Sequence, residues 1–410
     1  MLSKLTKLNI AKNRILRNIQ PINRNTKISL NECNQRINYN TLKSKLNLPE
    51  TRNSAVDGYG ISYKSFLNNP KNRFKVVAIA KAGKPYSKKI MAREAIEIYT
   101  GAILPKGVDT VVMFEKCERV DSKLWIKEDI KRYQNVRPVG ENIKKGEIIV
   151  KKGDILNPSH IGQLAASGNN EIQVFKKVKV AIISTGDEIV NLTGQKKSYG
   201  QIYDSNRPML KSIFNKNYLE ILDMGIVKDT KIALVNKYLK CLSKCDVVIS
   251  SGGASEGIED HTQSALKHIG AESLVWQLAI KPGKPMGAGI LDKKLIFCLP
   301  GNPVAAFVCS KFLIKPALIK MAGGNNFTSF FLKIPSGFEH TKKIGRTEFL
   351  RARIENSGLK SVVLQHGRKG SGVISSLIGS DGLVEIPYNK KSVCKGELLK
   401  FYPFEHKGIW

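Results

Sequence analysis

The pattern of apolar and polar positions changes character along the chain. Apolar residues recur at helical spacing from Leu5 to Ile19, and Pro21 cannot continue a helix, so one helix is predicted there. Between residues 74 and 155, short apolar runs separated by turn residues predict a β-rich region. After Gly323 the chain again has short strands and turns, which indicates a small C-terminal β domain.

From Val178 to Lys320, strand and helix patterns alternate, which predicts a parallel sheet with helices on both faces. We therefore predict a multidomain α/β protein with a doubly wound α/β domain at residues 176–322. Residues 1–175 are expected to form a mixed N-terminal region with a β-rich insert at about 50–140; its elongated part is implied only by the family resemblance described below. Residues 323–410 are expected to form a small, β-barrel-like domain. Predicted strands begin at Val178, Leu219, Asp246 and Leu295, and predicted helices begin at Pro208, at Thr230, after Asp260 and at Pro303.

Composition narrows the choice of partners. The formal net charge of +33, from 67 Lys and Arg against 34 Asp and Glu, first suggests nucleic acid or an anionic membrane. The basic residues are mostly lysines spread over the whole length, however, without an Arg-rich tract or a basic stripe interleaved with aromatic residues. We therefore expect no nucleic-acid and no membrane partner, and we interpret the charge as a solvated surface that attracts anionic substrates.

Cysteine usage and hydropathy favour a cytoplasmic protein. The seven cysteines include no Cys-x-x-Cys pair, so neither a disulfide framework nor a zinc ribbon is indicated. No apolar run approaches the roughly 18 residues that span a bilayer. Residues 1–31 contain seven basic residues and no acidic one, which leaves an organelle-targeting segment as the alternative.

Four loops that follow predicted strands carry the candidate chemistry. In an open α/β sheet, such loops meet at one edge, where ligands bind. Their carboxylates suit a hard cation, their hydroxyls and backbone N–H groups suit phosphate, and their lysines suit further negative charge. The sequence therefore predicts a site for an anionic, nucleotide-like ligand and a metal. The loops are Ser184–Glu188, Ser250–Gly257, Lys281–Lys284 and Leu299–Pro303.

Each loop also has a purely structural interpretation. A glycine turn that only closes a strand–helix connection is the alternative for Ser250–Gly257. For Asp260 the alternative is a helix N-cap, but a carboxylate beside a phosphate favours a metal between them. Surface charge is the alternative for Lys281 and Lys284, although the prolines around them stiffen the loop and suit an oxyanion site.

The remaining polar residues divide into structural and metal-binding groups. We interpret Asn302 as an N-cap and Pro303 as the first helical residue of a loop whose backbone shapes the pocket wall. Segments 53–60 and 100–102 look like structural turns when taken alone. An acidic edge in a basic protein favours Mg²⁺. The residues of this edge are Asp187, Glu188, Asp204 and Asp229.

Nine motifs follow one another in a fixed order. They are Ser54–Tyr59, Thr100–Ala102, Gly140–Ile143, Ser184–Glu188, Asp204–Asn206, Ser251–Ser255, Lys281–Pro285, Leu299–Pro303 and Gly345–Arg351. Together they resemble the MoeA-type molybdopterin molybdenumtransferases and the gephyrin E domain, and the resemblance extends from about Leu5 to Phe404. It implies an L-shaped homodimer whose α/β region is a molybdopterin-binding module, shared with the molybdopterin adenylyltransferase that acts one step earlier and makes transient contact.

The implied reaction inserts molybdate into adenylyl-molybdopterin, releases AMP and uses Mg²⁺. No Ser/His/Asp or Cys/His set indicates covalent catalysis, so positioning and electrostatics are expected to dominate. Asp57 and Thr100 would reach the cleft from the partner subunit. The implied catalytic residues are Asp57, Thr100, Glu188, Asp229, Asp260, Lys281 and Lys284. The implied metal ligands are Asp187, Glu188, Asp229 and Asp260. The implied substrate-binding residues are Ser184, Thr185, Gly186, Gly252, Gly253, Ser255, Pro300, Gly301, Asn302, Pro303 and Ser371.

Some positions depart from the family pattern. Asn142 stands where the family commonly has Asp, which removes a charge, and Val56 replaces a Met with little effect on packing. Gln277 stands where some relatives carry a lysine, and Glu256 adds negative charge beside the expected phosphate site. Two other functions remain as alternatives. An adenylyltransferase would not need the region of Asp57 or the C-terminal domain, and a gephyrin-like scaffold protein would be expected to carry a further domain and linker.

Overall fold

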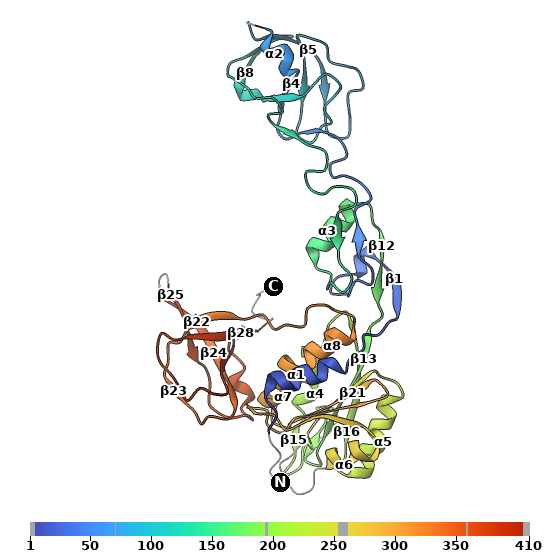
Figure 1. The fold of residues 1–410 in the computed structure, drawn as a ribbon, viewed down its shortest axis with the longest axis vertical. Coiled ribbons are helices and arrows are strands. Elements are labelled where there is room, and N and C mark those ends of the chain that lie inside the picture. Colours follow the sequence, from blue (N-terminus) through green and yellow to red (C-terminus); the bar gives the residue numbers. More distant parts are fainter. Residues whose placement is uncertain (1–4, 70, 193–195, 253–260, 358–359, 405–410) are drawn as a thin grey trace. The chain divides into compact units, whose positions relative to one another are not determined.

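The chain divides into two compact units. The computed structural model describes residues 5–69, 71–192, 196–252, 261–357 and 360–404 (Figure 1). Unit 1 comprises residues 1–40, 152–157 and 172–410, and unit 2 comprises residues 41–151 and 158–171. Unit 2 is therefore inserted into unit 1 along the sequence.

A six-stranded sheet forms the centre of unit 1, with strand order β16-β13-β17-β21-β20-β18. The first four strands are parallel, whereas β20 runs antiparallel to both β21 and β18. The four predicted strands are thus parallel, as expected, and the structure adds β20 and β18, which the sequence analysis did not predict. The strands are β13 (Val178–Thr185), β16 (Leu219–Val227), β17 (Val247–Ser251), β18 (Glu272–Trp276), β20 (Gly287–Leu291) and β21 (Lys294–Leu299).

The missed strand β20 is joined to the predicted strand β21 by a turn with an unusual sequence. Leu291 pairs with Lys294, so β20 and β21 form a hairpin with a two-residue loop. Both loop residues, Asp292 and Lys293, have positive φ, at 48° and 65°. Such turns are usually recognised by an Asn-Gly or Asp-Gly pair, because glycine adopts positive φ without strain. Asp-Lys gives no comparable signal in the sequence.

Helices cover both faces of the central sheet, as predicted. Along β13, Val180 and Ile182 join the core shared with α1, α4, α7, η3 and α8, whereas Ala181 and Ile183 face α5 and α6. This alternation follows from the period of two in a strand. The helices are α1 (Leu8–Arg17), α4 (Asn206–Ile213), α5 (Lys231–Leu242), α6 (His261–His268), α7 (Pro303–Cys309), the π-helical turn η3 (Ser310–Ile314) and α8 (Lys315–Met321).

Most predicted helix starts agree with the structure. α5 begins directly after Thr230, whose hydroxyl accepts a hydrogen bond from the Ala233 N–H at 3.4 Å. α7 begins at Pro303, where the missing N–H of proline costs nothing. α4 begins at Asn206, before the expected Pro208.

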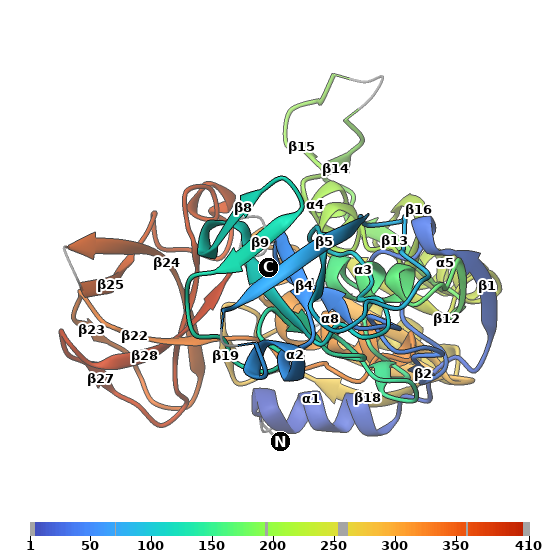
Figure 2. The same ribbon diagram turned by 90° about the horizontal axis from the view of Figure 1, so that it is seen from above.

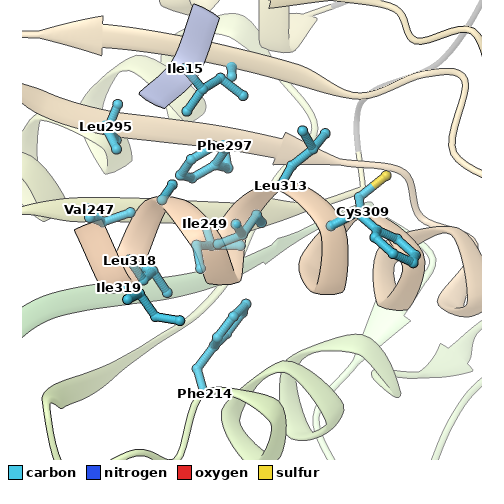
Figure 3. Close-up of a cluster of buried hydrophobic side chains, with 14 of the residues drawn as sticks. Ile15, Phe214, Val247, Ile249, Leu295, Phe297, Cys309, Leu313, Leu318 and Ile319 are labelled. Carbon is cyan, nitrogen blue, oxygen red and sulfur yellow. The ribbon is translucent and has the colours of Figure 1, made fainter. Parts of the chain in front are cut away.

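The larger core of unit 1 connects segments from both ends of the sequence. Ile15 of α1 and Leu318 of α8 pack in the same cluster as Ile249 and Phe297 of the sheet (Figure 3). Phe297 is fully buried, and Phe214 at the end of α4 belongs to the same cluster. The first helix is therefore part of the α/β core, although more than a hundred residues separate it from the first strand of the sheet.

A second sheet of unit 1 contains one strand from the α/β part. Its order is β19-β24-β26-β28-β22, with β25 paired to β24. In the parallel pair β19 and β24, Ile280 lies opposite Thr347 and Lys281 lies opposite Glu348. The elements are β19 (Ile280–Lys281), β22 (Leu332–Pro335), β23 (His340–Thr341), β24 (Thr347–Ser357), β25 (Lys360–Gln365), η4 (Ile374–Ser376), β26 (Gly382–Ile386), β27 (Ser392–Val393) and β28 (Leu398–Pro403).

Smaller elements complete unit 1. β1 (Asn25–Ser29) pairs with β12 (Glu171–Phe175), and the turn η1 (Leu30–Glu32) follows β1. The short parallel pair β14 (Ile189–Val190) and β15 (Ile202–Tyr203) projects beside α4 (Figure 2).

Unit 2 is built around its own six-stranded sheet, with order β7-β4-β6-β5-β9-β8. The predicted β-rich character of this part of the chain is confirmed, and the sheet packs on two apolar clusters. The strands are β4 (Gly58–Ile61), β5 (Arg73–Ala80), β6 (Glu94–Ile98), β7 (Thr110–Met113), β8 (Cys117–Val120) and β9 (Lys123–Ile126). The other elements are β2 (Leu42–Lys43), β3 (Asn53–Ser54), α2 (Tyr63–Leu67), η2 (Phe114–Lys116), β10 (Val136–Arg137), β11 (Ile148–Val150) and α3 (Pro158–Ala166). In the described part of the chain, no helix has the length and apolar character needed to cross a membrane.

The core assignment can be tested by truncating one aromatic ring. We expect Phe297→Ala to lower the free energy of unfolding by about 3–5 kcal/mol, because it leaves a cavity in a close-packed cluster. Urea unfolding measures the change. Ile232→Ala serves as the control, since Ile232 is 75% exposed and its truncation should change stability by less than about 0.5 kcal/mol. Equal effects of the two substitutions would contradict the assignment.

Candidate functional site

The predicted loops meet at the carboxyl ends of the parallel strands. Ser251 at the end of β17 lies opposite Ser184 of β13 on one side and Leu299 of β21 on the other. Thr185, the last residue of β13, lies opposite Val227 of β16. The loops that follow these four strands therefore lie along one edge of the sheet, which we call the carboxyl-end edge.

Two buried hydroxyls at this edge lack partners. Ser184 and Thr185 are each 1% exposed. Neither side-chain oxygen has a hydrogen-bond partner within the described part of the chain. A buried polar group without a partner costs about 1–3 kcal/mol, and a bound ligand that supplies a partner recovers this cost. Both hydroxyls are thus suited to contact a ligand.

Gly252 has a conformation that only glycine tolerates well. Its φ is +97°, and a Cβ atom placed there would lie 2.0 Å from the Thr185 carbonyl oxygen. The Gly252 N–H donates to the Leu299 carbonyl at 3.2 Å, so in this structure Gly252 contributes the turn between two strand ends. Gly186 also has positive φ, at 146°, directly after Thr185. Gly253, Ser255 and Asp260 lie outside the described residues.

Asn206 links two of the loops, and sequence reasoning assigned it no role. Its side-chain amide donates to the Ser251 hydroxyl and to the Gly301 carbonyl, both at 2.7 Å. Asn206 is 7% exposed, and its Oδ1 atom has no partner within the described ranges. The only signal for it in the sequence was its place in the Asp204–Asn206 motif.

Carboxylates gather beside β13 and β16. The Asp229 N–H donates to Asp187 Oδ1 at 3.4 Å, while Asp229 Oδ1 is buried and unpaired among the residues described. Burial raises the pKa of Asp229, the charges of Asp187 and Glu188 raise it further, and His261 opposes the shift. A cation would relieve this crowding. Among the described residues, no three His, Cys, Asp or Glu side chains are placed so that they could hold a metal ion.

Asp204 differs from the other acidic residues of the edge because its charge is already compensated. It is 3% exposed, and its carboxylate accepts a hydrogen bond from the Arg207 N–H at 3.0 Å. The Arg207 Nε atom lies 3.6 Å from the same carboxylate. Asp204 therefore stabilises the start of α4 in this structure.

A cavity of about 720 Å³ lies within unit 1, between the α/β part and the C-terminal sheet. The loop Pro300–Asn302, which follows β21 at the carboxyl-end edge, is part of its wall. Its charged lining consists of five basic side chains and one carboxylate, which suits an oxyanion or phosphate. These charged residues are Lys281, Lys284, Arg346, Arg351, Lys369 and Glu348.

The two predicted lysines are in different surroundings. Lys281 Nζ lies 2.7 Å from Glu348 Oε1, so its charge is paired within the cavity wall. Lys284 is half-buried and lines the same cavity. Between them, Gly283 lies over α7, because a Cβ atom at this position would lie 2.8 Å from Cys309 Sγ. The loop is thus packed against the core rather than mobile.

Arg351 is a cavity residue that sequence reasoning missed. It is 8% exposed, and its guanidinium donates to the Arg368 carbonyl at 2.9 Å and the Gly370 carbonyl at 3.4 Å. Its Nε atom has no partner in the ranges described. Burial lowers the pKa of Arg351 and the charge of Glu348 opposes the shift, but a guanidinium stays protonated.

Further residues of the cavity wall connect its two sides. Ser371 lines the cavity, and its carbonyl accepts a hydrogen bond from the Val304 N–H at 3.0 Å. Asn302 occupies the N-cap position of α7, as predicted, but its side chain makes no capping hydrogen bond. Pro303, the first residue of α7, is not part of the wall as described. The α/β part and residues 366–371 therefore enclose the cavity from opposite sides.

Asp57 and Thr100 lie together in unit 2. Asp57 Oδ1 accepts hydrogen bonds from the Thr100 N–H and hydroxyl, both at 2.7 Å. These two bonds lower the pKa of Asp57, so the exposed carboxylate stays ionised at neutral pH. The structure thus brings together two predicted residues that are 43 positions apart.

The fold and the site define an α/β protein whose sheet edge and adjoining basic cavity are suited to an anionic ligand. Three family regions match the chain in order: the MoeA N-terminal region (domain I and II) at residues 6–168, a probable molybdopterin binding domain at 181–320, and the MoeA C-terminal region (domain IV) at 333–404. The chain belongs to the MoeA family and is a molybdopterin molybdenumtransferase, a transferase of molybdenum cofactor biosynthesis.

Individual relatives cover nearly the whole chain. A molybdopterin molybdenumtransferase of Haemophilus influenzae is 32% identical over 387 residues, covering 92% of this chain and 94% of the relative. One from Staphylococcus aureus is 30% identical, with coverages of 86% and 84%. The crystal structure of a molybdopterin biosynthesis MoeA protein from Pyrococcus horikoshii has a TM-score of 0.79 at 31% identity, and covers 98% of this chain and 99% of that one. The family resemblance and the three-part α/β architecture predicted from the sequence are thereby confirmed.

The role of Gly252 in the edge can be tested by adding a methyl group. We expect Gly252→Ala to destabilise the protein by more than about 1 kcal/mol, because the new Cβ would collide with a backbone carbonyl and φ would be strained. Urea unfolding provides the measurement. The matched control is Gly162→Ala in α3, where a Cβ has open space, and helix propensity predicts a gain of about 0.5–1 kcal/mol. Unchanged stability of Gly252→Ala would mean that the loop has another conformation.

Proposed function

We propose that the protein inserts molybdate into adenylyl-molybdopterin, with release of AMP, in a reaction that depends on Mg²⁺. The observation that carries this proposal is the loop Pro300–Asn302, which belongs both to the carboxyl-end edge and to the wall of the basic cavity. A nucleotide-like group at the edge and an oxyanion in the cavity would therefore be neighbours. Family membership supplies the chemical identity of the two substrates.

The edge offers a binding surface for the adenylylated pterin. Ser184 and Thr185 contribute hydroxyls, and Asn206 contributes an amide oxygen, that have no partner among the residues the structure describes. Gly186 and Gly252 have positive φ, which lets the backbone turn tightly at the ends of β13 and β17 beside these groups. By family resemblance, Gly253 and Ser255 would extend this surface to the phosphate groups.

The acidic residues of the edge fit a divalent cation. Asp229 has a buried carboxylate oxygen without a partner in the described ranges, and the neighbouring Asp187 and Glu188 are exposed. By family resemblance, Asp260 would complete this set. Bound there, Mg²⁺ would polarise the phosphoanhydride of the substrate and neutralise charge on the departing AMP.

The basic cavity is proposed to hold molybdate. Lys281, Lys284 and Arg351 supply positive charge, and Ser371 supplies a hydroxyl within the same wall. Charge-assisted hydrogen bonds from such groups are stronger than neutral ones, which suits a small dianion.

Catalysis would rest on positioning and electrostatics. A buried thiol, Cys309, lies beneath Gly283, but burial raises its pKa to about 12, so it stays protonated and is a poor nucleophile. Attack of water on the phosphoanhydride would release AMP and leave the pterin phosphate, and the two dithiolene thiols would replace one oxygen of molybdate held nearby, with loss of one water. In this scheme no side chain forms a covalent intermediate.

A second subunit is proposed to complete the site. Asp57 and Thr100 form one exposed pair in unit 2, and the family resemblance assigns this pair to the cleft of the partner in a homodimer. The three regions 1–175, 176–322 and 323–410 would then have separate roles in dimerisation, pterin binding and closure of the cavity. We further propose a cytoplasmic location and a transient contact with the adenylyltransferase that supplies the substrate.

Single-turnover incubation tests the function directly. With adenylyl-molybdopterin, molybdate and Mg²⁺, we expect AMP release that stops when Mg²⁺ is chelated and when molybdate is omitted. Asp260→Ala should lose this activity, while Asp129→Ala, an exposed carboxylate of unit 2 without an assigned role, should keep it. Consumption of ATP with pyrophosphate release would instead identify an adenylyltransferase. AMP release that persists after removal of Mg²⁺ would contradict the metal assignment.

Subunit mixing tests the shared cleft. We expect Asp57→Ala and Asp260→Ala to be inactive as separate homodimers. After exchange of subunits, each heterodimer should contain one intact cleft of two, so activity should return to at most about half of wild type per heterodimer. Native mass spectrometry confirms the exchange, and mixed dimers without activity would place Asp57 outside the partner's cleft.

A further inference from the structure

One carboxylate lies in the wall of an otherwise basic cavity. Glu348, on β24, is the single acidic residue in the described lining, where five basic side chains surround the space. Its side chain is 6% exposed, and it lies opposite Lys281 in the pairing of β24 with β19. Such a residue lowers the positive potential of the cavity, so its presence needs an explanation.

Glu348 belongs to a chain of four side chains. Its Oε1 lies 2.7 Å from Lys281 Nζ, and its Oε2 lies 2.9 Å from His340 Nε2. Gln365 Nε2 lies 3.1 Å from His340 Nδ1. With the amide donating to Nδ1, the imidazole carries its proton on Nε2 and donates to Glu348. All four residues line the cavity.

The carboxylate is held in its charged form by these partners. Burial by itself would raise the pKa of Glu348, but the hydrogen bonds from Lys281 and His340 outweigh burial and hold the pKa below its ordinary value. The sign of the shift means that Glu348 is ionised at neutral pH. The Glu348 carboxylate is therefore charged at neutral pH and can pair with the Lys281 ammonium.

Lys281 needs such a partner if it is to act at a fixed point. Its side chain is 59% exposed, whereas the Glu348 side chain is almost completely buried and fixed from two sides. A lysine side chain has many rotamers, and a buried partner selects among them before a ligand arrives. The side chain is then already ordered before the ligand binds, so its loss of conformational entropy does not weaken binding.

We propose that Glu348 is a positioning residue that holds the Lys281 ammonium at the cavity wall for an oxyanion. The assignment rests on the proposed function, which places molybdate in this cavity. This role predicts that removal of the negative charge of Glu348 from the basic cavity weakens the binding of an anion. If only the net charge of the cavity mattered, the same substitution would strengthen the binding of an anion.

Calorimetric titration with molybdate alone shows whether loss of the Glu348 charge weakens or strengthens molybdate binding. We expect Glu348→Gln to bind molybdate about tenfold more weakly than wild type, in the range of couplings measured between neighbouring groups. Glu385→Gln is the matched control, because Glu385 lies in the same sheet, is hydrogen-bonded to Tyr402 at 2.6 Å and does not line the cavity as described. Its affinity should equal that of wild type.

A second pair of variants separates position from charge. Glu348→Asp keeps the charge but withdraws the carboxylate from Lys281, so it should also weaken molybdate binding. In a Lys281→Met background, Glu348→Gln should cause no further loss, because there is no ammonium to position. In turnover, Glu348→Gln should raise the KM for molybdate and leave the KM for adenylyl-molybdopterin unchanged. Far-UV circular dichroism and urea unfolding show whether each variant is folded.

The possible outcomes address different claims. Wild-type protein that does not bind molybdate would overturn the oxyanion site of the proposed function, and with it this assignment. Wild-type binding with equal or tighter binding by both Glu348→Gln and Glu348→Asp would overturn the positioning role alone. Should Glu348→Gln not fold, the Glu348→Asp titration decides the question, because weaker binding supports the positioning role and unchanged or tighter binding overturns it.

Discussion

The pairing of β19 with β24 is the interaction on which the cavity depends. β19 contains only Ile280 and Lys281, and it follows the α/β sheet in sequence while lying in the C-terminal sheet. Backbone hydrogen bonds in this pair fix the register that sets Lys281 opposite Glu348. Because the loop containing Lys284 begins immediately after β19, the same register also determines where the second lysine lies. A shift of β19 by one residue would turn Lys281 to the other face of the sheet, away from Glu348.

Buried polar groups without partners lie along the carboxyl-end edge in the described part of the chain, at a cost in stability. Ser184, Thr185, Asn206 and Asp229 each keep a buried oxygen without a partner in the described part of the chain. Buried polar groups are normally satisfied in native proteins, so a cluster of exceptions along one edge is informative. The adjacent apolar core is well packed on both faces of the sheet and supplies the stability that these groups remove. A ligand with several donors and acceptors would satisfy the edge as a whole.

The sequence predicted those features that have a local signal. Strand and helix periods located β13, β17, β21 and the loops after them, and Thr230 and Pro303 marked the starts of α5 and α7. The hairpin of β20 and β21 was missed because Asp292 and Lys293 adopt positive φ without the usual glycine.

No local sequence pattern predicted the long-range contacts of the cavity. Glu348 contacts Lys281 across 67 positions, a separation that no local pattern encodes. Arg351 was visible only within a motif, because its burial and its contacts with the 366–371 loop exist only in the folded chain. Residues such as these can be assigned only once the two sheets are seen side by side.

The place of α1 in the α/β core has a consequence for folding during synthesis. Lys320 donates to the Leu16 carbonyl at 2.7 Å, across 304 positions, and Ile15 packs in the same cluster as Leu318. The inserted unit 2 completes its sheet from residues made long before α8 leaves the ribosome. The apolar face of α1 therefore has no packing partner in α8 until about three-quarters of the protein has been translated. A chaperone that shields such faces on nascent chains would act on this segment for longer than on any part of unit 2.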